Sequence, residues 1–366
     1  MNIDSWRLHL YYYIILKMTN TETQKHDISI SVAKGLLITL MVIGHSGAPS
    51  DVVGFLYLIR MPCFFFISGM LFKEKYLLDV RSYIKRKING LYVPFVKWSL
   101  IFLLLHNLFA WLNIYSTHYT IGDAGTRLFK IFTLTGSEQL LGGFWFLKEL
   151  LYASVITILF SKFVTTLGVK QNWRNQLLQS LFFVLLAYLA SIAPFKIPTI
   201  GSKTLLATAY FIAGSAFKKI NAGEKRPLGV GILGYIAVIA VSLFFTANID
   251  VRGRDIFTYF AISLIGSVST IYIAKHIWGG GMRVMNFIGK NTLNILTFHF
   301  LAFKIVSLAV IVAYGLPIER LAEFPVLAHN SSFLWILYTI AGVALPLLIG
   351  EGLEKIETLF KKYKKE

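Results

Sequence analysis

The chain has 366 residues, of which 56% are hydrophobic and only 15% are charged. No soluble domain of this length needs so apolar a composition, and the apolar runs are continuous rather than alternating. The sequence therefore predicts an all-α polytopic membrane protein and excludes a membrane β-barrel. The net charge of +18 would favour nucleic-acid binding in a soluble protein. The single cysteine, Cys63, excludes a disulfide framework and a cysteine-ligated metal site.

The chain begins with residues 1–27, in which the apolar and aromatic run at 8–16 is too short to span a bilayer. No small-residue cleavage pattern follows it, so we expect an interfacial amphipathic segment rather than a signal peptide. Residues 28–350 should form one integral membrane domain, and residues 351–366 a basic cytoplasmic tail. About ten spanning helices are predicted, at 28–46, 52–72, 92–113, 141–161, 176–193, 203–220, 228–246, 255–275, 286–314 and 332–350.

Lysine and arginine residues concentrate in alternate connecting segments, on the side of the N-terminus. This asymmetry predicts that both termini face the cytoplasm, because cytoplasmic loops are enriched in these residues. Topology then explains most of the positive charge without nucleic acid. The longest outer loop, at 114–140, carries Gly122, Gly125 and Gly136 and is a candidate re-entrant segment.

The first predicted helix carries Lys34 and His45, two ionisable residues in an apolar run. On an ideal helix they are separated by about 1100°, so they lie within about 20° of each other and about 16 Å apart along the axis. Ionisable groups inside membrane segments mark functional sites by default. The alternatives are that Lys34 snorkels inward and that His45 is an interfacial histidine bonded to a loop carbonyl. Asp27 lies too far from His45 to orient it and is expected to cap the helix.

Arg60 lies in the middle of the second predicted helix, directly before Met61 and Pro62. The proline frees a backbone carbonyl and kinks the helix. A mid-span arginine there indicates either a water-filled, substrate-binding cavity or a structural residue that holds carbonyls at the kink.

The fourth predicted helix carries Trp145, Lys148 and Glu149 near its outer end, close to the predicted depth of His45 and Arg60. Glu149 could orient His45 or pair with Arg60, or it could form a charge pair without chemistry. Trp145 is either an interfacial belt residue or a platform for a sugar ring.

The ninth predicted helix carries Asn291 and Asn294 one turn apart, followed by His299 at mid-depth. The two asparagines can hydrogen-bond across helices, and His299 is either a packing histidine or a second candidate site residue. A basic run at Arg81, Lys85, Arg86 and Lys87 lies at the predicted cytoplasmic mouth, where phosphates of an anionic cofactor could dock or where topology alone would place charge. No Walker loop, dinucleotide fingerprint or metal-ligand cluster is present in the sequence.

Several motifs resemble those of membrane-bound acyltransferase family 3. They are Asp27-x6-Lys34-Gly35-x8-Gly44-His45-Ser46, Met61-Pro62-x-Phe64-Phe65-Phe66-x-Ser68-Gly69, Trp145-Phe146-Leu147, and Gly289-x-Asn291-Thr292-Leu293 followed by His299. The basic residue and histidine of the first motif have the family spacing. The closest subgroup resembles short sugar O-acetylases that lack a fused periplasmic hydrolase domain.

The resemblance implies a ten-helix enzyme of the bacterial inner membrane. It would transfer an acyl group, expected to be acetyl, from cytoplasmic acetyl-CoA to a hydroxyl of a cell-surface glycan or lipid-linked glycan precursor. It also implies that His45 is catalytic and that Lys34 binds the donor. The chain departs from the family at Arg60, where many members have histidine, and after the basic run, where a second arginine is missing.

His45 could act as general base toward a sugar hydroxyl or carry the acyl group itself, and the sequence leaves both routes open. We expect Lys34, Arg81, Lys85 and Arg86 to bind the donor, Glu149 to assist catalysis, and no metal to be required. The acceptor side is expected to include Arg60, Trp145, Lys148, Asn291 and His299. A transporter or flippase for an anionic or glycan substrate is the alternative, although no paired interrupted helices are evident, and a lipid-linked glycan polymerase is a further one.

Overall fold

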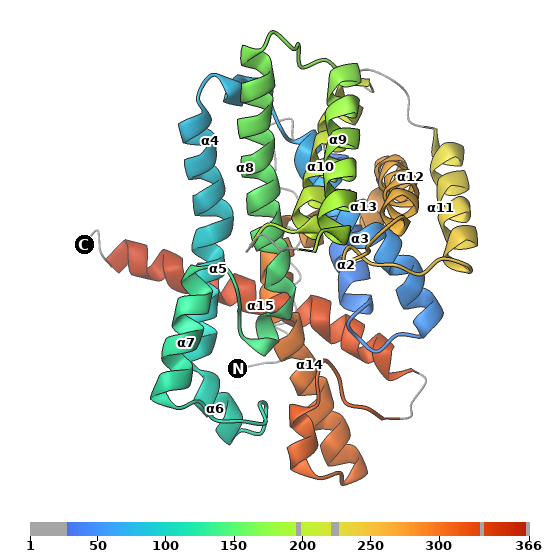
Figure 1. Cartoon of the computed structure of the whole chain (residues 1–366). Helices are drawn as coiled ribbons and strands as arrows, with labels where there is room; N and C mark the ends of the chain where they lie inside the picture. Colours follow the sequence, from blue (N-terminus) through green and yellow to red (C-terminus); the bar gives the residue numbers. More distant parts are fainter. Residues whose placement is uncertain (1–27, 195–198, 221–226, 330–332, 364–366) are drawn as a thin grey trace.

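The computed structural model describes residues 28–194, 199–220, 227–329 and 333–363, and every regular element in these ranges is helical (Figure 1). The predictions for residues 1–27, including the cap at Asp27, lie outside the described residues. The helices are α2 (Ile28–Ile43), α3 (Ser50–Met70), η1 (Glu74–Leu77), α4 (Val80–Lys87), η2 (Ile88–Tyr92), α5 (Val93–Leu104), α6 (His106–Trp111), α7 (Ile121–Phe132), η3 (Gln139–Phe144), α8 (Trp145–Thr166), α9 (Trp173–Ile192), α10 (Ser202–Ile220), α11 (Leu228–Ser242), α12 (Asp255–His276), α13 (Gly279–Lys290), α14 (Thr292–Tyr314), η4 (Ile318–Ala322) and α15 (Leu334–Tyr363).

The protein is an all-helical, polytopic membrane protein. Within the described ranges, seven helical stretches are long and apolar enough to cross a membrane, and α2 and α11 are shorter apolar helices. Each of the ten predicted spans contains a helix. The seven long stretches are Ser50–Met70, Val80–Leu104, Gln139–Thr166, Trp173–Ile192, Asp255–His276, Thr292–Tyr314 and Leu334–Leu359.

Several predicted boundaries differ from the structure. The first helix ends at Ile43 rather than at 46, which leaves His45 in a turn. The third begins at Val80, because the basic run is itself helical and continues through the π-helical turn η2 into α5. Pro94 in the first turn of α5 cannot donate an amide hydrogen bond to the preceding turn, which fits a local change of helical pitch.

The predicted helix at 286–314 is divided at Asn291. The side chain of Asn291 donates to the carbonyl of Phe287, and the backbone amide of Asn291 bonds to Ile288 instead of continuing the regular pattern. Its backbone is non-helical, with φ −106° and ψ 21°. Local side-chain bonds of this kind compete with helix continuation, which the apolar pattern does not report. The last helix, in contrast, continues past 350, so the predicted tail is helical as far as Tyr363.

Small residues allow the site-bearing helix α2 to approach α13 closely. A Cβ atom on Gly35 would overlap with the carbonyl of Met285, and one on Gly289 would overlap with the carbonyl of Ser31. Close backbone approach increases van der Waals contact between membrane helices, where the hydrophobic effect contributes little. The reciprocal glycines therefore fix the distance between these two helices.

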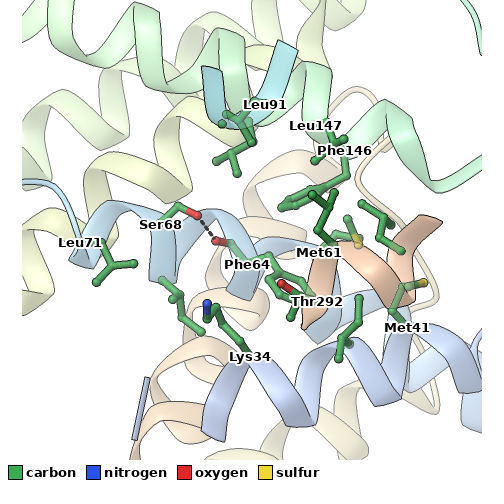
Figure 2. Close-up of a pocket in the computed structure, with 16 residues that line it drawn as sticks. Lys34, Met41, Met61, Phe64, Ser68, Leu71, Leu91, Phe146, Leu147 and Thr292 are labelled. Atoms are coloured by element: carbon green, nitrogen blue, oxygen red, sulfur yellow. Dashed lines mark hydrogen bonds between the residues drawn. The ribbon is translucent and has the colours of Figure 1, made fainter. Parts of the chain in front are cut away.

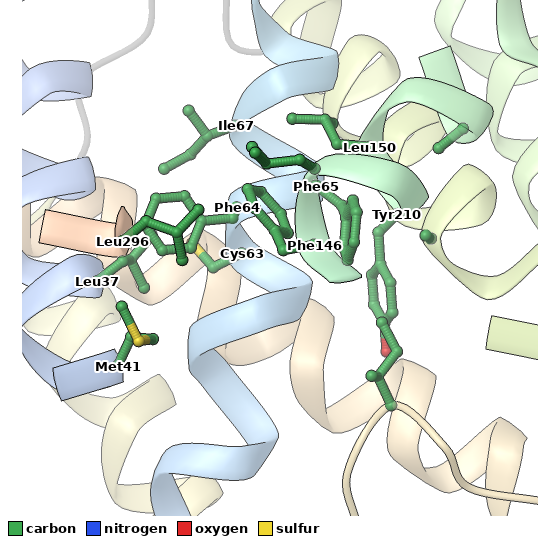
Figure 3. Close-up of a cluster of buried hydrophobic side chains, with 14 of the residues drawn as sticks. Leu37, Met41, Cys63, Phe64, Phe65, Ile67, Phe146, Leu150, Tyr210 and Leu296 are labelled. Atoms are coloured by element: carbon green, nitrogen blue, oxygen red, sulfur yellow. The ribbon is translucent and has the colours of Figure 1, made fainter. Parts of the chain in front are cut away.

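The helix α3 is held against α10 in the same way, since Cβ atoms on Gly69 and Gly214 would overlap with the carbonyls of Phe211 and Phe66. On another side of α3, the Phe64 and Phe65 rings lie 5.5 and 5.1 Å from the ring of Phe146 on α8 (Figure 3). Aromatic pairs at these distances stabilise the interface beyond their buried area. The α3 helix thus packs against α2, α10, α11 and α12, and α10 in turn packs against α8 and α9.

The predicted outer loop at 114–140 does not insert its glycines between the membrane helices. It forms the helix α7, which packs along α5 (Figure 1). Thr120 and Asp123 form a capping box at its start. Hydrogen bonds from Thr120 hold the pKa of the Asp123 carboxyl below its ordinary value. These glycines therefore do not enter the bundle, whereas η3, whose first two residues end the predicted loop, packs on α14.

The glycine packing predicts a specific stability difference between two positions of α13. Gly289→Ala should lower the melting temperature of the purified protein, because overpacking of this kind costs about 1–3 kcal/mol. Gly280→Ala is the matched control, since a Cβ atom there meets nothing within 4 Å, and alanine has the higher helix propensity. Thermal unfolding in one detergent measures both. Equal melting temperatures for the two variants would contradict the packing account.

Candidate active site

His45 lies in the tight turn that joins α2 to α3, and this turn is held from several sides. The His45 amide bonds to the Val42 carbonyl at 3.0 Å. The buried Ser46 hydroxyl donates to the Ile43 carbonyl at 2.9 Å and accepts from the Thr339 hydroxyl of α15 at 3.1 Å. The half-buried His45 ring is consequently presented from a fixed backbone rather than from a mobile loop.

His299 of α14 is the titratable side chain that lies against His45. The two ring centroids are 5.7 Å apart, and the Phe300 ring lies 5.1 Å from His45 and 4.0 Å from His299. His299 is fully buried. The structure thus brings together two histidines that are 254 positions apart in the sequence.

The hydrogen bonds of His299 define its tautomer. Its Nδ1 lies 3.0 Å from the Ile295 carbonyl and 3.1 Å from the Leu296 carbonyl, so Nδ1 carries the proton and donates it. The Nε2 atom is then the acceptor of a neutral ring, and it has no hydrogen-bond partner among the described residues. An unpaired acceptor inside a bundle is costly unless a partner binds there. Substrate or His45 can supply that partner.

Arg60 is buried beside the His45 turn, and its guanidinium completes the end of α2. Its Nη1 donates to the Met41 carbonyl at 3.3 Å. That carbonyl is left over because the His45 amide, its usual helical partner, bonds to Val42 instead. The guanidinium also lies 4.6 Å from the centre of the Tyr57 ring. Arg60 therefore donates to a carbonyl of the neighbouring helix α2 and not to one beside Pro62 in its own helix α3.

A cavity of about 250 Å³ extends along α2 between α3, α8 and α14. Among the described residues that line it, Lys34 alone is charged. Figure 2 shows Lys34 pointing from α2 into this space, toward the region of Phe64, Ser68 and Thr292. The wall also includes Met41, whose carbonyl binds Arg60, and Leu296, one turn before His299. The cavity accordingly connects the level of Lys34 with the level of the two histidines.

The basic helix α4 leads directly to this cavity. Arg81, Lys85 and Arg86 are exposed, and Arg86 donates to the Tyr76 hydroxyl at 3.2 Å. The next turn, η2, contributes Gly90 and Leu91 to the cavity wall. A ligand that carries phosphate groups on a long, weakly polar arm could fit here. Its phosphates would contact the cationic surface, and its arm would lie in the apolar cavity.

Glu149 is buried, but its contacts are not with His45 or Arg60. One carboxylate oxygen accepts from the Thr204 hydroxyl at 2.6 Å, and the other lies 3.2 Å from the ammonium of Lys148. The prediction that Glu149 orients His45 is not supported by these contacts. Trp145, one turn earlier, lies under the ammonium of Lys203, 4.6 Å from the ring centroid.

Asn291, between α13 and α14, and Asn294, in the first turn of α14, bond within their own segment. Asn291 bonds to the Phe287 carbonyl, and Asn294 lies 3.5 Å from the Asn291 amide oxygen. Asn294 also packs where Gly350 of α15 leaves room for its amide. The predicted hydrogen bonds across helices are replaced by these local bonds.

Sequence reasoning missed several residues near these groups. Phe300 and Thr204 carry no motif that would single them out. A buried pair formed by His106 and Glu138, 2.8 Å apart, was also missed. His106 lies within the predicted span at 92–113, where any ionisable residue is unusual, and this was the available signal.

The contact between Gly44 and Arg60 predicts a non-additive pair of substitutions. A Cβ atom on Gly44 would overlap with the Arg60 guanidinium, so Gly44→Ala should destabilise the protein by about 1–3 kcal/mol. In an Arg60→Met background the same substitution should have little effect, because the obstructing group is gone. A double-mutant cycle of melting temperatures measures this coupling. Equal effects of Gly44→Ala in both backgrounds would contradict the contact.

A family model described as an acyltransferase domain, Acyl_transf_3, matches residues 27–351. The search of curated proteins found no match, and neither did the search of solved structures. The matched region covers the helices of the cavity, both histidines and Lys34. The chain belongs to the acyltransferase 3 family and is a membrane-bound acyltransferase.

Proposed function

We propose that this protein transfers an acetyl group from cytoplasmic acetyl-CoA to a hydroxyl of a cell-surface glycan or of its lipid-linked precursor. The observation that carries the proposal is the pairing of His45 with His299, each about one turn along the chain from a residue, Met41 or Leu296, of a cavity that Lys34 also lines. The proposed setting is the bacterial inner membrane, with ten spanning helices and both termini in the cytoplasm. The basic surface of α4 would then face the acetyl-CoA pool, and the opposite end of the bundle, where α6 and α7 lie, would face the glycan (Figure 1).

The donor is proposed to bind across α4 and the Lys34 cavity. Arg81, Lys85 and Arg86 would contact the phosphates, since they are exposed cations on one short helix. The mostly apolar cavity suits the pantetheine arm, and Lys34 would donate to one of its carbonyl oxygens. This arrangement would bring the thioester to the end of the cavity near Met41 and Leu296, beside the two histidines.

His45 is proposed to act as the general base. It accepts the proton of the sugar hydroxyl while that oxygen forms its bond to the thioester carbonyl carbon. It then returns the proton to the sulfur as the carbon–sulfur bond breaks, which gives the acetylated sugar and free CoA thiol. An imidazole suits both steps because it gains and loses a proton near neutral pH.

Two neighbours would assist His45. The unpaired Nε2 of His299 can accept a hydrogen bond from the His45 ring and so fix which nitrogen of His45 faces the substrate. Arg60 is packed against Gly44, one residue away, and supplies a fixed positive charge beside the reacting groups as negative charge develops on the carbonyl oxygen. In the alternative two-step route, His45 takes the acetyl group itself and passes it on.

The acceptor side is proposed to include Trp145 and Lys148 at the start of α8, with Asn291 between α13 and α14 and His299 on α14. Glu149 would act there through Lys148 and Thr204, the groups it contacts, rather than through His45. Membership of an acyltransferase family favours this scheme over the transporter alternative.

The function is tested by release of free thiol from acetyl-CoA with the purified protein. The His45→Ala variant should cleave the thioester at least about 100-fold more slowly than the parent, the lower bound expected for loss of a general acid–base group. His276→Ala is the control, because His276 is exposed at the end of α12 and bonds to the Tyr272 carbonyl of its own turn. Equal thiol release by His45→Ala and the parent would refute the proposal.

A further inference from the structure

A second cavity, also of about 250 Å³, lies between α6, the start of α7 and the segment before η3. In contrast to the Lys34 cavity, every residue that lines it has a polar side chain. Those that matter here are His106, Tyr115, Tyr119, Arg127, Glu138 and Gln139. It lies toward the end of the bundle opposite α4, which is the predicted outer side (Figure 1).

The cavity is built around a rigid, buried pair. His106 Nδ1 lies 2.8 Å from Glu138 Oε2, and His106 Nε2 lies 3.0 Å from the Thr117 carbonyl. A carbonyl can only accept, so Nε2 carries a proton and points away from the carboxylate. The Tyr115 and Tyr119 rings stack on the imidazole, with centroids at 4.6 and 3.3 Å. Both ring nitrogens and the ring faces of His106 are therefore engaged.

The second carboxylate oxygen of Glu138, Oε1, is buried without a hydrogen-bond donor among the described residues. Glu138 is 2% exposed, and its Oε1 has no hydrogen-bond partner in the part of the chain that the structure describes. A buried carboxylate oxygen without a donor costs about 1–3 kcal/mol or more, so a ligand that supplies a donor would be favoured. The surroundings do not suit a metal ion, because the neighbouring imidazole is already bonded and Arg127 brings a positive charge to the same cavity.

The remaining groups supply both donors and acceptors. Burial and the nearby Glu138 carboxylate raise the pKa of the Tyr115 and Tyr119 phenols, so both keep their hydroxyl hydrogen. The Tyr115 oxygen already accepts from the Leu140 amide at 3.4 Å, which leaves its hydrogen available. Arg127 lies 5.4 Å from the Tyr119 ring at the rim. Mixed donors and acceptors around one carboxylate match hydroxyl groups, each of which donates and accepts.

We infer that this cavity binds one neutral, hydroxyl-rich sugar ring, with two of its hydroxyl groups directed at Glu138 and Arg127. The cavity is a binding site apart from the His45 site, and the volume suits one ring rather than a chain.

A short segment connects this sugar site to the histidine pair. Glu138 directly precedes η3, and the glycines at the other end of η3 pack on α14. A Cβ atom on Gly143 would lie 3.7 Å from His299 Cε1, and one on Gly142 would lie 3.3 Å from Phe300. A glycan held at Glu138 is thus a few residues of chain from the proposed transfer site. That the sugar belongs to the acceptor glycan rests on the proposed function, whereas the binding itself does not.

The test uses the purified full-length protein and three probes, the methyl glycosides of glucose, galactose and N-acetylglucosamine, with binding followed by saturation-transfer NMR and titration. The parent should bind at least one of them. Glu138→Gln should weaken that binding about tenfold or more, as expected for a lost hydrogen bond to a charged group. Glu319→Gln, the same change at an exposed residue of η4, should bind like the parent, and so should His45→Ala.

Absence of binding by the parent up to the solubility limit of the probes would overturn the inference, as would unchanged binding by Glu138→Gln. If Glu138→Gln cannot be purified, the Arg127→Gln variant tests the inference instead, because Arg127 is partly exposed and does not belong to the buried pair of His106 and Glu138. Its binding should weaken with no change in melting temperature, and unchanged binding would overturn the inference. In either failure His45-dependent thiol release would persist, so failure of the sugar site is distinguishable from failure of the proposed function.

Discussion

A guanidinium between two membrane helices needs oxygen and aromatic partners, because water is not available to solvate it. Arg60 meets this requirement with the Met41 carbonyl and the Tyr57 ring. The same bond completes the C-terminal end of α2, where a cation also interacts favourably with the helix dipole. The turn that presents His45 begins at this point, so the position of the histidine depends on a buried charge in the next helix.

Close backbone packing supplies the rest of the geometry. Reciprocal glycines hold α2 against α13 and α3 against α10, and Gly143 lets η3 approach Leu296, one turn before His299. With these helices held in place, the rings of His45 and His299 lie 5.7 Å apart. The wall of the cavity that Lys34 lines also includes Met41 and Leu296, each about one turn along the chain from one of these histidines. One set of packing constraints therefore positions both the histidine pair and the cavity that Lys34 lines.

The sequence predicted what depends on composition and local pattern. Apolar runs located a helix in each of the ten predicted spans, and isolated ionisable residues in those runs pointed to His45, Lys34, Arg60 and His299. The breaks at Ile43 and Asn291 were not predicted, since they arise from individual hydrogen bonds that hydropathy does not report. The side chains that contact each candidate residue could not be predicted either. Similar predicted depth in the membrane suggested that Glu149 contacts His45. In the structure, Glu149 contacts Thr204 and Lys148, and the His45 ring lies against His299.

The central claim is that the Lys34 cavity delivers a thioester to His45. It is tested most directly by a cryo-EM structure with a non-hydrolysable acetyl-CoA analogue in which a methylene group separates the sulfur from the carbonyl. The account predicts density for the pantetheine arm along Lys34, Phe64 and Leu296, with the analogue's carbonyl carbon in contact with the His45 ring. Density for the arm outside this cavity, or a carbonyl carbon that contacts neither histidine, would contradict it.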